Sequence, residues 1–357
     1  MKKSPRLPHF TLAAMGLVLF TVPLTSALAQ TPAPAGLQVP AKTLQAPTTV
    51  SPQLQKIIAL PLRTNWDLLP KTGEEWKPVA DAGAAGLVKN VPGMLERLKV
   101  KVEKTTIDGV RAYIVTPETI APENNNRQLI HMHGGCYVLN PGEAGLPEAI
   151  FMAGFGHIKV ISVDYRMPPE AVFPAALDDG ITVWKAALKT MPAKNMAIFG
   201  TSAGGALTLE MVLKAKELGL PLPAAIAPGT PMSDVTKVGD TFYTNAMVDN
   251  VLVSPDGFCD AGAKVYANGH DMKDPMLSPV YGDMKGFPPT ILTSGTRDLL
   301  LSNTVRVHRK LRQAGVEATL QVYEGMSHAH YIRDDTAPES KEAFEEIAAF
   351  FDKHLAK

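Results

Sequence analysis

The stretch NMAIFGTSAGGALTLE, residues 195–210, decides the fold. Its first half, NMAIFG, is a short apolar run typical of a buried strand, and GALTLE begins a helix-forming run that continues through residue 219. Gly-Thr-Ser-Ala-Gly therefore occupies a tight turn from strand into helix. Small residues beside Ser202 let neighbouring backbones approach closely and leave the hydroxyl exposed above the sheet. The stretch predicts a nucleophilic serine at the C-terminal end of a strand.

The rest of the chain repeats the alternation of short apolar runs and helical patterns. A hairpin is predicted first, over residues 96–118, around the turn Asp108-Gly109. Strands apolar on both faces, separated by helices, indicate a mostly parallel sheet covered by helices on both sides. We therefore predict an α/β fold with about eight strands. The further strand candidates are RQLIHMHG, IKVISVDY, PAAIAPG, PPTILTSG and ATLQVYEG.

The bulk composition excludes some classes of function. The chain has 357 residues, 45% of them hydrophobic, which is ordinary for a globular protein. Basic and acidic residues both number 35, so no basic field is available to hold nucleic acid. We expect no nucleic-acid partner, and the sequence does not indicate an oligomeric state.

The N-terminus has the pattern of a secretory signal peptide. Basic residues precede an apolar run that ends in Ala-Leu-Ala, which predicts cleavage after Ala29 and a periplasmic or secreted protein. Removal of residues 1–29 takes away three basic and no acidic residues and leaves a formal charge of −3. The alternative is an uncleaved anchor, but the apolar run before Pro23 is short for a span, so we expect no stable membrane insertion.

The mature part is expected to contain a flexible leader at 30–50, rich in Pro, Ala and Thr, and an N-terminal cap segment at 51–95. The catalytic domain would span 96–357. Within it, residues 231–285 interrupt the strand-helix rhythm, as expected for an insertion over one end of the sheet.

A serine nucleophile needs a base, and the base needs an acid to orient it. In this architecture the acid and then the histidine follow the serine along the chain. Asp298 follows the strand PPTILTSG and His328 follows ATLQVYEG, so both should open on the same sheet edge as the serine. His330 competes as base, two residues later. Asp283 and Asp334 compete as acids, although neither follows a strand.

Backbone donors for an oxyanion are expected in the loop His133-Gly134-Gly135-Cys136, which follows the apolar strand LIHM. We assign the donors to the N–H groups of Gly135, Cys136 and Ala203, with Gly134 supplying flexibility.

Two other interpretations of this region carry less weight. A metal site at His131 and His133 has no third ligand in a nearby motif, and no metal or organic cofactor is expected. Cys136 and Cys259 are the two cysteines of the chain, and an oxidising compartment would allow one bridge. We expect them to stay unpaired, because Cys136 lies in a motif whose backbone has another role.

With these motifs in place, the chain resembles the bacterial hormone-sensitive-lipase-like esterases of the α/β-hydrolase superfamily over residues 95–355. HGGCY matches the family's His-Gly-Gly-Gly motif, DYRMPPE matches its Asp-Tyr-Arg-x-x-Pro-Glu stretch, and GTSAGG, RDLL and GMSH follow in order. The resemblance implies a cap over the active site, and a bracing role behind the oxyanion loop for Asp164, Tyr165, Arg166 and Glu170. Cys136 replaces the third glycine, and its N–H would still donate at a negative φ.

The leading hypothesis is a serine carboxylesterase that hydrolyses small, fairly apolar esters through an acyl-enzyme. The family resemblance suggests short acyl chains. A lactone or aryl-amide hydrolase with the same triad is the first alternative. A non-catalytic small-molecule binder on this fold is the second, and it would be expected to lose the general base, which His328 retains.

Overall fold

The computed structural model describes residue 1 and residues 36–356. It divides into two compact units, residues 1–44 and 45–357, which are treated separately. Residues 36–44 of the first unit form no helix or strand. The predicted signal peptide lies outside the described residues except for Met1, as do residues 30–35 of the predicted leader.

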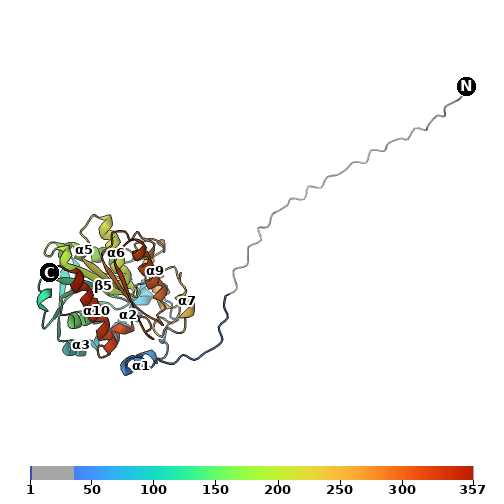
Figure 1. Ribbon diagram of the computed structural model, residues 1–357, viewed down its shortest axis with the longest axis horizontal. Helices are drawn as coiled ribbons and strands as arrows, with labels where there is room; N and C mark the ends of the chain where they lie inside the picture. The colour runs from blue at the N-terminus through green and yellow to red at the C-terminus, as the bar shows by residue number, and fades with distance from the viewer. Residues whose placement is uncertain (2–35, 357) are drawn as a thin grey trace. The chain divides into compact units, whose positions relative to one another are not determined.

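A mixed sheet of eight strands forms the centre of the second unit, and the predicted α/β fold is confirmed (Figure 1). The strands lie in the order β1-β2-β4-β3-β5-β6-β7-β8, with β1 and β2 antiparallel to their neighbours and all later pairs parallel. Their bounds are β1 Val100–Ile107, β2 Val110–Pro117, β3 Gln128–Met132, β4 Val160–Val163, β5 Met196–Thr201, β6 Ala225–Gly229, β7 Thr290–Gly295 and β8 Ala318–Tyr323.

The predicted hairpin is confirmed as β1 and β2. Asp108 and Gly109 both have positive φ, 47° and 89°, as the favoured two-residue hairpin turn requires. The sheet then alternates strand and helix, so the C-terminal ends of its parallel strands meet at one edge.

Helices cover both faces of the sheet, with α5 and α6 on one side of β5 and α10 on the other (Figure 1). The helices are α1 Pro52–Ile58, α2 Gly73–Val88, α3 Val91–Leu98, α4 Pro147–Gly156, α5 Ala175–Leu188, α6 Ala203–Glu217, α7 Thr241–Thr244, α8 Phe258–Ala267, α9 Leu301–Gln313 and α10 Pro338–His354. Short 3-10 turns are η1 Pro122–Asn124, η2 Gly142–Gly145, η3 Ala193–Asn195, η4 Pro279–Tyr281 and η5 His330–Ile332.

Successive strand residues point into two separate cores. On β5, Ile198 belongs to the core beneath α5 and α6, whereas Ala197 and Phe199 belong to the core beneath α4 and α10. All three are at most 1% exposed. Neither face of this strand meets water, which explains why both are apolar. Packing on both sides holds the end of the strand rigidly.

Two segments outside the sheet lie against each other. The Asn250 amide, between β6 and β7, donates to the carbonyls of Ile57 and Leu60 at 3.0 and 3.2 Å. The Phe258 N–H donates to the Trp66 carbonyl at 2.8 Å. The segment that includes α1 and the segment that includes α7 and α8 are thus joined by side-chain and backbone hydrogen bonds.

The last residues of the predicted leader contact the folded unit. Arg297 donates to the carbonyl of Gln45, and Pro47 lies against Gly325. Gln45 and Pro47, within the predicted leader, therefore have contacts in the second unit. Within the described residues, no helix combines the length and apolar character needed to cross a membrane.

Candidate active site

Ser202 lies at the turn between β5 and α6, as predicted. Its φ and ψ are 64° and −121°, a conformation that non-glycine residues adopt only under strain from the surrounding structure. A Cβ on Gly200 or Gly204 would collide with the Met132 carbonyl oxygen, so the turn requires glycine at both positions. Ser202 is 5% exposed, so the surrounding structure holds its backbone in this conformation.

Asp298 and His328 meet in the loops that follow β7 and β8. His328 Nδ1 lies 3.1 Å from Asp298 Oδ1, and Asp298 is fully buried. Burial alone would raise the pKa of Asp298, but the charge and hydrogen bond of His328 and further bonds from Thr230 and the Leu300 N–H lower it. The carboxylate is therefore ionised at neutral pH and accepts the Nδ1 proton, which leaves Nε2 as the basic nitrogen.

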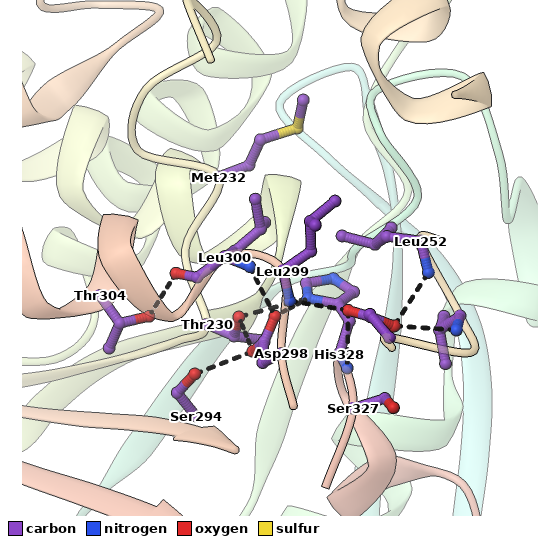
Figure 2. Close-up of polar contacts among 12 residues, drawn as sticks. Thr230, Met232, Leu252, Ser294, Asp298, Leu299, Leu300, Thr304, Ser327 and His328 are labelled. Atoms are coloured by element: carbon purple, nitrogen blue, oxygen red, sulfur yellow. Dashed lines mark hydrogen bonds and ion pairs between the residues drawn. The ribbon is translucent and has the colours of Figure 1, made fainter. Parts of the chain in front are cut away.

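Two hydroxyl groups that the sequence analysis did not identify complete the shell of this carboxylate. Figure 2 shows Asp298 between Thr230 and Ser294, whose hydroxyls both donate to Oδ2, the latter at 2.8 Å. Thr230 Oγ also lies 3.2 Å from His328 Nδ1. Thr230 directly follows β6, beside the elbow strand, but this position alone does not distinguish it from hydroxyls with structural roles.

Thr230 also connects the acid-base pair to the elbow. The Ser202 N–H donates to the Gly229 carbonyl at 2.9 Å, and the Met232 N–H donates to the Ser202 carbonyl at 3.0 Å. The segment that contacts Asp298 and His328 is thus bonded on both sides to the serine backbone. In the described chain, the Ser202 hydroxyl makes no direct hydrogen bond to His328.

The competing acid and base candidates have other partners. His330 Nε2 lies 2.9 Å from the Asn250 side-chain oxygen, and Nδ1 accepts the Ser327 N–H at 3.2 Å. Burial lowers the pKa of His330 to about 3. Asp283 and Asp334 accept backbone N–H groups of the residues two positions later, at the surface. None of the three contacts the Asp298–His328 pair.

The loop His133–Cys136 lies against the elbow, since a Cβ on Gly134 would stand 3.3 Å from Ser202 Cβ. Within the described chain, no backbone or side-chain acceptor takes the N–H groups of Gly135 or Cys136. The Ala203 N–H begins α6 and has no partner inside that helix. Among the residues that the structure describes, these three N–H groups are therefore donors without an acceptor.

The loop is braced from behind, as the resemblance implied. The Tyr165 hydroxyl donates to the His133 carbonyl at 2.7 Å, and Asp164 Oδ1 accepts the Gly142 N–H at 2.9 Å. Arg111 joins Asp164 to Glu170. The fourth of the residues named above, Arg166, pairs instead with Asp179 on α5.

Cys136 departs from expectation twice. Its φ is 53°, not negative, yet its N–H has no acceptor in the described chain, so a negative φ is not needed to leave this donor free. It also forms a disulfide with Cys259, across a Cα–Cα distance of 5.2 Å and a sequence separation of 123 residues. The prediction that the cysteines stay unpaired is wrong because α8 packs directly on the loop: a Cβ on Gly262 would stand 3.0 Å from the Cys136 carbonyl oxygen. The side chain points to α8, so bridging leaves the Cys136 N–H free.

The two histidines once considered as metal ligands have structural partners. His131 contacts Ser162 and Glu148 through its two ring nitrogens, at 2.9 and 3.1 Å. His133 stacks on Tyr165 with ring centroids 4.1 Å apart, and burial lowers its pKa to about 4. Across the residues that are described, no cluster of three or more His, Cys, Asp or Glu side chains could hold a metal.

Comparison with known proteins decides the family. Residues 129–332 match the model of a family with the alpha/beta hydrolase fold. An esterase of Acinetobacter venetianus is 30% identical over 256 residues, which cover 70% of this chain and 82% of that protein. This chain belongs to the bacterial hormone-sensitive-lipase-like esterases.

Solved structures of esterases agree with this assignment. A crystal structure of an esterase superposes with a TM-score of 0.87 at 46% identity, covering 90% of this chain and 99% of that one. An esterase from the bacterial hormone-sensitive lipase family gives a TM-score of 0.68 at 25% identity, covering 78% and 99%. The esterase described here is accordingly a carboxylic ester hydrolase.

Proposed function

We propose that Ser202, His328 and Asp298 are the catalytic triad of this esterase and that it hydrolyses small, fairly apolar esters. The observation that carries the proposal is the buried Asp298–His328 contact at the same sheet edge as the strained Ser202 turn. The Nδ1–Oδ1 hydrogen bond fixes the imidazole and leaves its other nitrogen for the serine proton. In unliganded sites such proton-transfer contacts are often open and tighten when substrate binds.

In the proposed reaction, Ser202 Oγ attacks the ester carbonyl while His328 accepts the hydroxyl proton and Asp298 stabilises the imidazolium. The tetrahedral oxyanion is held by the N–H groups of Gly135, Cys136 and Ala203, since these donors are not used elsewhere. His328 then protonates the leaving alcohol. Water, activated by the same imidazole, attacks the acyl-enzyme and releases the acid. No metal or organic cofactor enters these steps.

The segments at 51–95 and 231–285 are proposed to form a cap that binds the acyl or alcohol part of the substrate, because hydrogen bonds join them. A preference for short acyl groups is supported by relatives named acetyl-hydrolase and ethyl acetate hydrolase. Lactones and aryl amides are the alternative substrates for the same machinery.

We further propose that the protein is exported, with cleavage after Ala29. Two features support this: the order of charged, apolar and small residues at the N-terminus, and the disulfide, since disulfides persist in oxidising compartments. Export is tested by mass spectrometry of the protein from the periplasmic fraction, where a mature chain beginning at Gln30 is expected.

The test of the catalytic proposal is hydrolysis of p-nitrophenyl esters from acetate to palmitate by the wild type, Ser202→Ala and His328→Ala. Each variant should keep its fold and lose several orders of magnitude in kcat. Activity should be highest for short chains. A Ser202→Ala variant that keeps its rate contradicts the triad, and a flat or long-chain profile contradicts the short-acyl proposal. Parallel assays with a lactone and an aryl amide decide between the substrate classes.

A further inference from the structure

Asp249 is a fully buried carboxylate beside the acid-base pair, in the segment between β6 and β7. Its Oδ1 accepts the N–H groups of Val251 and Leu252 at 2.8 and 3.1 Å. Its Oδ2 accepts those of Leu299 and His328 at 2.8 and 3.2 Å. Leu252, Leu299 and His328, which are labelled in Figure 2, supply three of these four N–H groups. All four partners are backbone donors.

Four N–H donors favour the ionised form of Asp249. Burial and the nearby charge of Asp298 raise the pKa of Asp249, whereas His328 and the N–H groups of Leu299 and Val251 oppose that rise. If Asp249 were protonated, its O–H would point at backbone N–H groups, which cannot accept a hydrogen bond. The anion satisfies all four donors, so the geometry is consistent with a charged Asp249.

The two donors on Oδ2 come from different loops. Leu299 directly follows Asp298 after β7, and the other donor is the N–H of His328 itself, after β8. One oxygen therefore connects the loop of the acid to the loop of the base. The 3.1 Å contact between the two side chains depends on how these loops are placed relative to each other.

Neighbours of Asp249 contact the same two loops. The Asn245 amide donates to the Asp298 carbonyl at 2.8 Å, and the Asn250 N–H donates to the Ser327 hydroxyl at 3.2 Å. The segment 245–252 therefore touches the acid loop and the base loop at several points. Within the described residues of this segment, Asp249 contacts both loops with a single carboxylate oxygen.

We propose that Asp249 is a positioning residue that fixes the separation of the Asp298 and His328 loops. This inference rests on the proposed catalytic triad. Asp249 contacts no reacting atom, and its effect is to keep the imidazole at the distance and angle at which it exchanges a proton with the serine. Small displacements of such groups cost up to about 10²-fold in rate. Substrate affinity does not depend on this contact.

The test is Asp249→Asn, assayed with a p-nitrophenyl ester. The asparagine amide has one acceptor oxygen, so it can accept from only one of the two pairs of N–H groups. Its own NH₂ then points at the other pair. We expect kcat to fall about 10²-fold with KM within about twofold of wild type. Asp249→Glu keeps the charge but displaces the carboxylate by one methylene, and should give a smaller loss of kcat. This second variant tests the proposal even where the asparagine variant does not fold.

Asp179→Asn is the matched control, because Asp179 lies on α5 and outside the segment between β6 and β7. It is also a buried aspartate, 4% exposed, which accepts the Arg166 N–H at 2.8 Å and pairs with the Arg166 guanidinium. It has no hydrogen bond to the Asp298 or His328 loop within the described chain. Its substitution should lower the melting temperature as Asp249→Asn does, while kcat stays within about twofold.

The outcomes separate this inference from the catalytic proposal. If Ser202→Ala is inactive and Asp249→Asn keeps its kcat, or loses no more kcat than Asp179→Asn at an equal fall in melting temperature, Asp249 is structural and the inference is overturned. A rise in KM equal to the fall in kcat/KM would overturn it as well. If Ser202→Ala stays active, the triad fails and the inference fails with it.

Discussion

The disulfide between the oxyanion loop and α8 provides a strong test of the cap arrangement. Cys136 and Cys259 are separated by 123 residues, which include β4, β5 and β6. In the chain-entropy model, a bridge that closes a loop of this length removes about 5 kcal/mol of unfolded-state entropy at 25 °C. Whole domains are stable by about 5–15 kcal/mol, so this bridge would account for a large share of the stability.

The experiment compares urea unfolding of the oxidised wild type, the same protein after reduction, and the double variant Cys136→Ala/Cys259→Ala. Both open forms should have a free energy of unfolding lower by about 5 kcal/mol than the oxidised form. The reduced wild type separates the covalent effect from the loss of buried sulfur, because its sequence is unchanged. Fluorescence and circular dichroism should give coincident transitions.

Activity adds a second measurement. Since Cys136 is one of the proposed oxyanion donors, release of its side chain from α8 should lower kcat for a short-chain ester more than it raises KM. A thiol titration of the denatured protein should find no free thiol before reduction and two after it. Two free thiols in exported protein, or equal unfolding midpoints for the oxidised and reduced forms, would refute the reasoning.

Two further predictions concern buried polar groups. Burial raises the pKa of Glu210, which is fully buried and receives a hydrogen bond from the Tyr137 hydroxyl. Its contribution to stability is complete below the unfolded pKa near 4.5 and is lost as the pH rises toward the folded value. The free energy of unfolding of Glu210→Gln should therefore rise relative to wild type by about 1.4 kcal/mol for each pH unit above 4.5, as long as Glu210 stays protonated in the folded wild type. Urea unfolding at several pH values measures this, and a difference between the two proteins that does not change with pH would contradict it. Thr230→Val removes one donor from Asp298 but keeps the shape of the side chain, so kcat should fall about tenfold with little change in melting temperature, whereas an unchanged kcat would mean that Ser294 and His328 suffice.

The sequence predicted the frame of the site because that frame follows from local patterns. The strand NMAIFG, the glycines at 200 and 204 and the histidine after ATLQVYEG each lie within a few residues of the feature they determine. Parallel strands then bring their C-terminal ends to one edge, so three distant residues could be assigned to one place without coordinates. The hairpin at Asp108-Gly109 was predicted for the same reason, since its turn type is determined by two residues.

The parts that were missed depend on packing between segments far apart in the sequence. Asp249 lies in a loop without periodicity, and its importance comes from two N–H groups 50 and 79 residues later. The disulfide was missed because the spacing of two cysteines contains no information on how α8 packs. Thr230 and Ser294 were also missed, because a hydroxyl near the end of a strand can have many structural roles and the sequence does not show which one applies.

Two of the contacts that the sequence did not predict involve the same segment of the chain. Cys259 and Asp249 belong to the segment between β6 and β7, and each bonds to a different element of the proposed machinery, the oxyanion loop in one case and the acid and base loops in the other. A segment that only covered the substrate would need neither bond. Because the oxyanion donors and the acid-base pair reach the site from opposite sides of the β5 elbow, a single segment bonded to both limits their relative movement. Substitutions that loosen this segment should therefore lower kcat even where they do not touch the substrate.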